Sequence, residues 1–287
     1  MSNIQHSFLV GLIGAGIQAS RTPAMHEREG AEQGLRFLYK LIDLEKLDLG
    51  GDALPELLTA AERMGFTGLN ITYPCKQSVI PLLTDLSDDA RALGAVNTVI
   101  LRNGQRIGHN TDWWGFVESF RRGLPDVKLD RVVQLGAGGA GAAVAHAALT
   151  LGVKKLTVFD LDLSRSQQLA TELASRFGNG RAIAGADLGG AMAEADGLIH
   201  ATPTGMAKHP GLPLPVKFLE PQLWVAEIVY LPLETELLRT AKDIGCRTMN
   251  GGGMAVFQAA EAFRLFTGIT PDTERMLRHF ASMWTGH

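Results

Sequence analysis

Residues 131–141 read Arg-Val-Val-Gln-Leu-Gly-Ala-Gly-Gly-Ala-Gly, and this stretch decides the fold. An apolar run that ends in a glycine-rich turn before the alanine-rich residues 141–151 predicts a buried strand followed by a helix. A second strand is expected at 155–159 and leads into Asp160, which lies 160 − 141 = 19 residues beyond the last glycine. This order and spacing are typical of a dinucleotide-binding unit, in which the helix N-terminus meets the pyrophosphate and the acid meets the ribose.

The same alternation of strands and helices extends through most of the chain. Further strands are expected at 7–14, 36–41, 68–73, 197–201, 223–229 and 247–249. Helices are expected at 23–34, 55–64, 76–84, 87–93, 113–124, 164–177, 234–244 and in a tail at 254–284. Asn103-Gly104 predicts a hairpin between 95–101 and 106–108. Strands that alternate with helices indicate an α/β fold with parallel pairing.

Length and composition restrict the class of protein. A chain of 287 residues suggests two domains at about 150 residues each. The 27 basic and 30 acidic residues give a net charge of −3, which argues against nucleic acid or an anionic membrane as the main partner. Two cysteines are too few for a disulfide scaffold. Without a long apolar run, and with no signal-peptide pattern at residues 1–6, we expect a cytoplasmic protein.

A second glycine-rich stretch, Gly14-Ala-Gly16-Ile-Gln-Ala19, competes for the dinucleotide. It is followed by Ser-Arg-Thr-Pro instead of a clear helix, and we identify no strand-ending acid at the corresponding distance. The stretch at 136–141 is therefore the predicted cofactor site.

Four polar clusters stand near predicted strand ends, where α/β proteins bind ligands. They are Ser20-Arg-Thr22-Pro23, Asn70-Ile-Thr72-Tyr-Pro-Cys75-Lys76, Gly94-Ala-Val-Asn97-Thr and Asn110-Thr-Asp112. Each cluster has an ordinary interpretation: a lysine after a strand is usually a solvated charge, and Asn-Thr-Asp or Ser-x-Thr-Pro usually forms a turn or a helix cap. Cys75 is either a reactive thiol beside a cation or a small turn residue.

Together these clusters resemble the shikimate dehydrogenases, and within them the quinate/shikimate dehydrogenase branch. The resemblance runs over nearly the whole chain. It is carried by Ser20-Arg-Thr-Pro-Ala-Met-His26, Asn70-Ile-Thr-Tyr-Pro-Cys-Lys76, Gly94-Ala-Val-Asn97-Thr, Gly108-His-Asn-Thr-Asp112, Gly136-Ala-Gly-Gly-Ala-Gly141, Ala201-Thr-Pro-Thr-Gly205-Met and Gly251-Gly-Gly-Met254 with Gln258. In this family the loop after the first strand serves the substrate.

The resemblance implies a role for each polar residue on the substrate side. Lys76 resembles the acid/base group that exchanges a proton with the reacting hydroxyl, and Asp112 resembles its hydrogen-bonding partner. Residues that resemble the substrate-binding groups are Ser20 and Thr22 for the carboxylate, Thr72, Asn97 and Gln258 for ring hydroxyls, and Tyr230 near the substrate and the nicotinamide. Threonine at position 22, where many shikimate dehydrogenases have serine, resembles the quinate-accepting branch.

The implied cofactor is NAD, with no metal. A carboxylate at Asp160 repels a 2′-phosphate, and members that use NADP often have Asn-Arg-Thr where this chain has Asp160-Leu-Asp162. The expected cofactor-binding residues are Gly136, Ala137, Gly138, Gly139, Ala140, Gly141, Asp160, Arg165, Thr202, Pro203, Ile228, Gly251 and Met254. Arg165 has two open interpretations: a partner of adenine or phosphate, or a solvated helix-face cation. No His/Cys cluster has metal-ligand spacing, and His109, His200 and His209 are interpreted as structural.

The expected fold is α/β, with an N-terminal α/β substrate domain and a C-terminal Rossmann-type dinucleotide-binding domain. The substrate domain comprises 1–112 together with C-terminal helices 254–287 that pack back on it, and the cofactor domain comprises 113–253. The expected reaction is reversible NAD-dependent oxidation of shikimate and/or quinate to the 3-dehydro ketone, by a monomer or homodimer. Two alternatives stay open: the same chemistry on an aminoshikimate-type or related cyclic hydroxy acid, and a non-catalytic cofactor-binding sensor or repressor.

Overall fold

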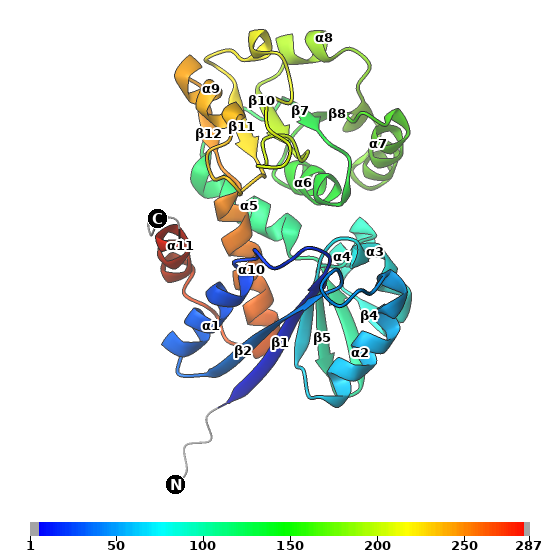
Figure 1. The fold of residues 1–287 in the computed structure, drawn as a ribbon. Helices are drawn as coiled ribbons and strands as arrows, with labels where there is room; N and C mark the ends of the chain where they lie inside the picture. The colour runs from blue at the N-terminus through cyan, green and yellow to red at the C-terminus, as the bar shows by residue number, and fades with distance from the viewer. Residues whose placement is uncertain (1–5, 284–287) are drawn as a thin grey trace. The chain divides into compact units, whose positions relative to one another are not determined.

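The computed structural model describes residues 6–283 and divides into two compact units (Figure 1). Unit 1 contains the described residues up to Thr111 and those from Val256 onward. Unit 2 runs from Asp112 to Ala255. Because the chain leaves unit 1, forms unit 2 and returns, the C-terminal helices belong to the same unit as the N-terminal strand.

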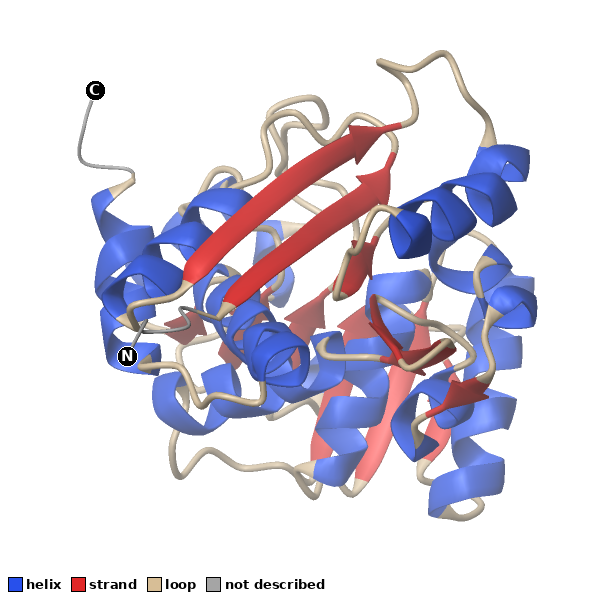
Figure 2. Ribbon diagram, turned by 90° about the horizontal axis from the view of Figure 1, so that it is seen from below, coloured by secondary structure: helices blue, strands red, loops and turns tan. Residues whose placement is uncertain are grey.

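Unit 1 is built on a mixed six-stranded sheet with the order β2-β1-β3-β5-β6-β4. Its strands are β1 (Ser7–Gly14), β2 (Arg36–Asp43), β3 (Gly68–Ile71), β4 (Asp85–Leu86), β5 (Thr98–Arg102) and β6 (Gln105–His109). β1 pairs in parallel with β2 and β3, whereas β5 is antiparallel to β3 and to β6. The predicted hairpin is confirmed, with Asn103 and Gly104 in the left-handed region at φ 54° and 73°. Figure 2 shows β1 and β2 as the two long strands of the molecule.

Helices cover both faces of the unit 1 sheet. On one face, α1 (Thr22–Glu32) and α10 (Gly252–Thr267) flank the strands, and Phe263 and Phe266 of α10 pack with Val10 and Phe37. On the other face lies α2 (Leu54–Arg63), whose Leu58 packs with the strands β1 and β3. The short helices of this unit are α3 (Cys75–Ser78) and α4 (Asp88–Leu93), with 3-10 turns at Gly51–Ala53 and Ile80–Leu82.

The C-terminal helix α11 (Thr273–Ser282) is fixed to α1 by a charged contact. Glu29 is 1% exposed, and its carboxylate accepts hydrogen bonds from Arg275 at 2.6 and 2.8 Å and from the Asp272 N–H at 2.9 Å. A buried carboxylate with these donors is well satisfied. The C-terminal helices therefore pack back on the first unit, as expected.

Unit 2 is an all-parallel six-stranded sheet with the order β12-β11-β10-β7-β8-β9. Its strands are β7 (Arg131–Leu135), β8 (Lys155–Phe159), β9 (Ala182–Ala184), β10 (Gly197–His200), β11 (Trp224–Glu227) and β12 (Arg247–Met249). Taken in chain order, this is the doubly wound Rossmann arrangement, whose strand order reverses between β7 and β10. Ligands bind at this reversal, outside the carboxyl ends of the strands.

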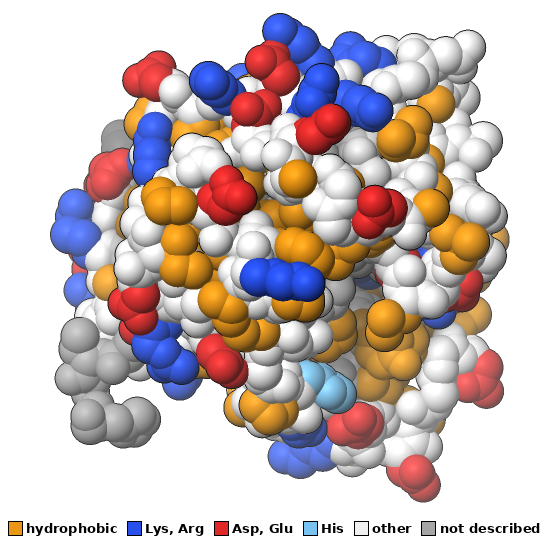
Figure 3. All heavy atoms as spheres, turned by 90° about the horizontal axis from the view of Figure 1, so that it is seen from above, with side chains coloured by type: hydrophobic (Ala, Val, Ile, Leu, Met, Phe, Trp, Pro, Cys, Tyr) orange, Lys and Arg blue, Asp and Glu red, His pale blue; other side chains and the backbone are white. Residues whose placement is uncertain are grey.

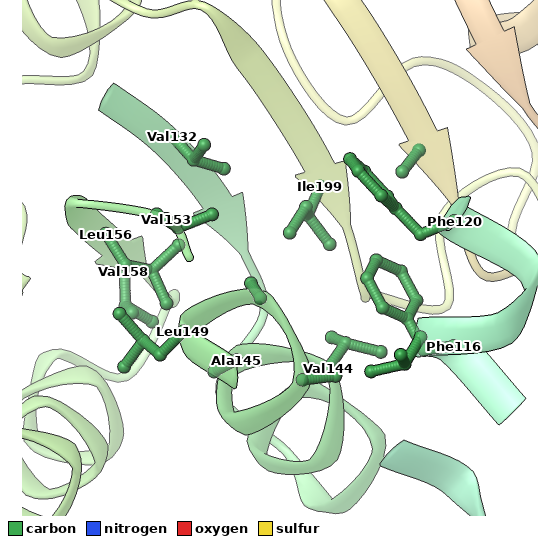
Figure 4. Close-up of a cluster of buried hydrophobic side chains, with 14 of the residues drawn as sticks. Phe116, Phe120, Val132, Val144, Ala145, Leu149, Val153, Leu156, Val158 and Ile199 are labelled. Atoms are coloured by element: carbon green, nitrogen blue, oxygen red, sulfur yellow. The ribbon is translucent and has the colours of Figure 1, made fainter. Parts of the chain in front are cut away.

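Helices cover both faces of the unit 2 sheet as well. α5 (Asp112–Gly123), α6 (Gly139–Thr150) and α7 (Leu163–Phe177) pack on one face, and Figure 4 shows Phe116 and Phe120 of α5 beside Val144 of α6 and Ile199 of β10. α8 (Leu188–Ala193), a 3-10 turn (Val216–Phe218) and α9 (Glu236–Ile244) pack on the other. The alternating strands and helices of the sequence therefore produce the expected α/β fold.

Several expected elements differ from the structure. The helix expected at 76–84 ends with α3 at Ser78, because Pro81 has no N–H to donate to the Gln77 carbonyl, and the chain continues as the 3-10 turn Ile80–Leu82. The tail is two helices, separated by Gly268 at φ 73° and by Pro271. The elements β4, β9 and α8 are not among the predicted ones, because each is too short to show a hydrophobic periodicity in the sequence. Trp284 and the N-terminal residues 1–5 lie outside the described residues.

Two surface properties bear on partners. Figure 3 shows acidic and basic side chains interspersed over the face seen from above. Within residues 6–283, none of the helices has the length and apolar character needed to cross a membrane.

Candidate active site

Four strands of unit 1 have their termini close together at one end of its sheet, which is called the edge below. β1 and β3 end there, β5 begins there and β6 ends there. The neighbouring segments carry four predicted site residues, Ser20, Thr72, Lys76 and Asn97. The topology therefore brings polar side chains from distant parts of the sequence to the edge where open α/β sheets bind ligands.

Lys76 lies in α3, directly after β3 and the cis peptide bond Tyr73–Pro74. Its main chain is fixed, because the Val96 N–H donates to the Lys76 carbonyl at 2.8 Å. The Lys76 side chain is half-buried. Burial raises the pKa of the neighbouring Cys75 thiol, so Cys75 fits the small turn residue and not the reactive thiolate.

The loop between β1 and α1 presents Ser20 and Thr22. The Thr22 N–H donates to the Ser20 hydroxyl at 3.3 Å, and Pro23 occupies the first turn of α1. Gly14 lets this loop approach the end of β3, since a Cβ at Gly14 would overlap the Thr72 side chain. The two hydroxyls and Thr72 therefore belong to neighbouring segments.

Asp43, at the end of β2, organises the same loop. Its carboxylate accepts hydrogen bonds from the N–H groups of Gly16 at 2.9 Å and Ile17 at 3.2 Å, and from the Gln18 side chain at 2.8 Å. The Gln18 side-chain amide is the main cause that holds the pKa of Asp43 below its ordinary value. The strand predicted at 36–41 continues to Asp43, so the first glycine stretch also has a strand-ending acid. Asp43 lies 43 − 19 = 24 residues beyond Ala19, compared with 19 for Asp160 beyond Gly141.

Asn97 is held in a buried polar network. It accepts from the Thr111 N–H at 2.8 Å, and its amide donates to the Thr111 hydroxyl at 3.0 Å. Thr98 donates to Asn97 at 3.0 Å, Asn70 donates to Thr98 at 3.0 Å, and the Tyr39 hydroxyl donates to Asn70 at 2.6 Å. Since these side chains are all under 9% exposed, the network fixes the orientation of Asn97.

Gln258 lies on α10, eight residues before Phe266. The Phe266 ring lies against Gly68 at the start of β3. At 1.5 Å per residue, Gln258 is displaced by about 12 Å along the helix from this contact. The placement of Gln258 near the substrate stays a prediction from the resemblance.

In unit 2, the side chain of Gln134 holds the two ends of the glycine-rich turn together. The Gln134 side-chain amide donates to the carbonyls of Gly136 and Gly141, each at 2.8 Å. Gly136 has φ 103°, and a Cβ there would overlap the Ala201 carbonyl. Only glycine permits this conformation and close approach at position 136.

The middle of the turn faces open space. A Cβ at Gly138 or Gly139 would meet no other atom of the chain within 4 Å. Gly138 is also the N-cap of α6, without a side-chain cap. A helix N-terminus that is open to a ligand in this way fits a dinucleotide pyrophosphate, because its N–H groups and dipole attract anions.

Asp160 is fixed beside this turn. Its two oxygens accept from the Ala137 N–H at 2.7 Å and the Asp162 N–H at 3.0 Å. A carboxylate in this place can accept hydrogen bonds from a ribose. Arg165 is exposed and lies 3.5 Å from Asp162, a distance that leaves its two interpretations open.

Further expected cofactor residues lie at the ends of β10 and β11. Thr202 and Pro203 follow β10, and Ile228 follows β11. Gly251 packs against Ile228, since a Cβ at Gly251 would overlap the Ile228 carbonyl. Met254 differs from the others because its side chain is 9% exposed and belongs to the apolar core beside α5.

Two expected residues belong to unit 2 and are described with it. Asp112 is buried at the first position of α5. Tyr230 is half-buried, and burial raises the pKa of its phenol. Among residues 6–283, no group of three or more His, Cys, Asp or Glu side chains is placed to hold a metal ion.

Sequence reasoning missed three buried polar residues that shape the site. Asp43 and Gln134 fix the two glycine turns, and Glu227 pairs with His200. The sequence does contain a signal for two of them. Gln134 and Glu227 stand within otherwise apolar strands, where a polar side chain needs buried partners.

The two units, with a dinucleotide-type turn in one and polar residues at the strand ends of the other, define a two-domain α/β protein of the dinucleotide-binding class. Residues 12–99 match the shikimate dehydrogenase substrate binding domain, and residues 251–279 match the shikimate 5'-dehydrogenase C-terminal domain. A shikimate dehydrogenase (NADP(+)) from Streptomyces avermitilis is 59% identical over 281 residues, covering 97% of each chain. The chain therefore belongs to the shikimate dehydrogenase family.

Two further relatives come from Corynebacterium glutamicum. A quinate/shikimate dehydrogenase (NAD(+)) from strain R is 51% identical, covering 96% of this chain and 99% of the relative. The structure of a quinate dehydrogenase in complex with NAD superposes with a TM-score of 0.93 at 49% identity, covering 97% of this chain and 100% of that one. The relatives thus differ in the cofactor and the substrate that their names give.

Proposed function

We propose that this protein catalyses the reversible NAD-dependent oxidation of quinate and/or shikimate to the 3-dehydro ketone. A substrate domain of 1–112 and 254–287, which largely coincides with unit 1, would bind the hydroxy acid. A cofactor domain of 113–253, which largely coincides with unit 2, would bind the dinucleotide. The observation that carries the proposal is the open glycine turn of unit 2 with Asp160 fixed at 2.7 Å from the Ala137 N–H. Family membership supports the choice of substrate class.

The proposed chemistry divides between the two units. A bound nicotinamide would supply the acceptor for the hydride that leaves the alcohol carbon. Lys76 accepts the hydroxyl proton at Nζ, and Asp112 hydrogen-bonds the same hydroxyl, so that the carbon becomes a carbonyl. Ser20 and Thr22 donate to the substrate carboxylate, while Thr72, Asn97, Gln258 and Tyr230 contact the rest of the substrate.

Because the relatives are named for different cofactors, the cofactor preference is argued from this chain's own residues. The Streptomyces relative is named for NADP and the Corynebacterium relative for NAD. At the end of β8 this chain has Asp160 and Asp162, and a 2′-phosphate next to two carboxylates would be repelled. We therefore propose NAD over NADP.

Replacing Asp160 tests this preference. The variant Asp160→Ala removes the ribose acceptor and the repelling charge, so the ratio of kcat/KM for NAD to that for NADP should fall about tenfold or more. Asp130→Ala, an exposed acid elsewhere in the unit that pairs with Lys154, serves as the control and should leave the ratio unchanged. A ratio that does not move in Asp160→Ala would place ribose recognition elsewhere.

The activity itself is tested by initial rates with quinate and with shikimate, each with NAD and with NADP. A clear rate with NAD and either acid supports the proposal, and the ratio of the two acids ranks the substrates. A rate only with NADP would contradict the cofactor part. No rate with any pair, although NAD binds, would favour first an aminoshikimate-type substrate and then a cofactor sensor.

A further inference from the structure

His200 and Glu227 form a fully buried pair at the carboxyl ends of neighbouring strands. β10 ends at His200 and β11 ends at Glu227, and the two residues are partners in the parallel register. Both are 0% exposed. His200 Nδ1 lies 2.9 Å from each oxygen of the Glu227 carboxylate. Such a pair is costly to bury unless its remaining hydrogen-bonding groups are also satisfied.

The pair connects to the loops on both sides of it. On one side, His200 Nε2 lies 2.5 Å from the Thr202 hydroxyl. On the other side, Glu227 accepts from the Val229 N–H at 3.0 Å and from the Thr235 hydroxyl at 3.1 Å. Thr235 is the N-cap of α9. One buried network therefore fixes the segments 201–205 and 228–230 relative to each other.

The hydrogen-bond roles follow from the carboxylate. A carboxylate oxygen only accepts, so His200 Nδ1 carries a proton and donates to Glu227, while Nε2 shares a hydrogen bond with the Thr202 hydroxyl. The Thr202 oxygen in turn accepts from the Thr204 N–H at 3.3 Å. The Thr202 hydroxyl therefore has its hydrogen bonds within the protein, with His200 and with Thr204.

The two segments also support the glycines on either side of them. Ala201 lies against Gly136 of the dinucleotide turn, and Ile228 and Val229 lie against Gly251. A shift of segment 228–230 would move Gly251, whose main chain is expected to approach the cofactor, whereas Gln134 holds Gly136 in place independently. The buried pair thus acts on the site without reaching its surface.

We propose that His200 and Glu227 are positioning residues that set the spacing of segments 201–205 and 228–230 around the nicotinamide half of the dinucleotide. The Thr202 hydroxyl belongs to this network. This inference rests on the proposed function, because it assumes that unit 2 binds a nicotinamide dinucleotide. It adds to that function the residues that shape the nicotinamide end.

The experiment compares NAD with ADP-ribose, which lacks the nicotinamide, by isothermal titration calorimetry. Thr202→Val removes the hydroxyl and keeps the side-chain shape, and His200→Gln removes the ring. Each variant should weaken NAD binding about tenfold and change ADP-ribose binding less than about twofold. Thr202→Ser should restore NAD binding. Thr171→Val, an exposed helix position on α7 in the same unit, is the matched control and should change neither ligand.

The double variant His200→Gln/Thr202→Val separates this role from direct contact. If both residues act as one unit, the double variant should bind NAD as weakly as either single variant. Losses that multiply, full NAD affinity in Thr202→Val, or equal loss for ADP-ribose would each overturn the inference. If His200→Gln does not fold, Thr202→Val and Thr202→Ser decide the outcome. A wild-type protein that binds neither ligand would instead refute the proposed function.

Discussion

Each sheet carries a glycine-x-glycine turn after an interior strand, Gly14-Ala-Gly16 after β1 in unit 1 and Gly136-Ala-Gly138 after β7 in unit 2. In each unit an aspartate at the end of the next parallel strand accepts an N–H from the turn. Asp43 accepts from Gly16 at 2.9 Å, and Asp160 accepts from Ala137 at 2.7 Å. The two turns therefore share a sequence pattern and the same stabilising contact.

The turns differ in the distance to the following helix. Residues 15–21 separate β1 from α1, whereas only residues 136–138 separate β7 from α6. The longer loop places the hydroxyls of Ser20 and Thr22 at the helix start, and its aspartate is buried among its own N–H donors. The shorter loop places the helix N–H groups next to the glycines. Loop length after the glycines, more than the glycines themselves, separates a site built from side chains from a site built from main-chain N–H groups.

The largest expected effect tests whether Lys76, at the strand ends of unit 1, takes part in the reaction. Lys76→Ala removes the proposed proton acceptor, so kcat should fall about 10²- to 10⁴-fold while NAD affinity stays within about twofold. Steady-state kinetics and NAD titration measure the two effects. Lys40→Ala, an exposed lysine on β2, is the control. Unchanged turnover in Lys76→Ala would remove Lys76 from the mechanism.

The second prediction compares the two turns directly. In Gly138→Ala the new methyl projects into open space and φ is −75°, so the fold tolerates it, but it occupies the path of the pyrophosphate. NAD affinity should fall about tenfold or more. In Gly16→Ala, φ 66° strains the loop, so the free energy of unfolding should fall by about 1 kcal/mol while NAD affinity is kept. Equal loss of NAD affinity in both variants would contradict the assignment of only the unit 2 turn to the dinucleotide.

The third prediction concerns the helix that follows the unit 1 turn. His26 of α1 is fully buried among Phe37, Tyr39, Phe263 and Phe266, and burial lowers its pKa to about 3. Below pH 6.5 the unfolded chain binds a proton that the native chain does not. From pH 6.5 down toward 3, native stability should therefore fall by about 1.4 kcal/mol per pH unit from this group.

His26→Phe removes this contribution. Urea unfolding at pH 8 and pH 5 should show a smaller loss of stability in the variant than in wild type. His209→Gln, at an exposed position, is the control. An unchanged pH dependence in His26→Phe would mean that His26 becomes protonated without unfolding.

The smallest expected effect concerns substrate choice at the unit 1 loop. Thr22→Ser keeps the hydroxyl and removes one methyl group, and a single methyl group changes the discrimination between two substrates by a few-fold. The ratio of kcat/KM for quinate to that for shikimate should shift a few-fold, with little change in NAD affinity. A constant ratio would mean that residue 22 does not select between the two acids.

The sequence predicted long elements well because their periodicity reports burial directly. The glycine turn, Asp160 and the hairpin at Asn103-Gly104 follow from local chemistry alone. Asp43 was missed because the last two residues of β2 depended on pairing with β1, as Gly14 pairs with Asp43. His200 and Glu227 lie 27 residues apart, so only the parallel register brings them together. Local patterns cannot specify such contacts.

The return of the chain to unit 1 has a consequence for its synthesis. Val10 and Phe37, made first, pack with Phe263 and Phe266, and Glu29 binds Arg275. The core of unit 1 therefore stays incomplete until the last helices emerge, whereas unit 2 has all of its residues by position 255. Domains fold as units during translation, and contacts between distant residues form slowly. The part of the protein that is begun first is accordingly the part that is finished last.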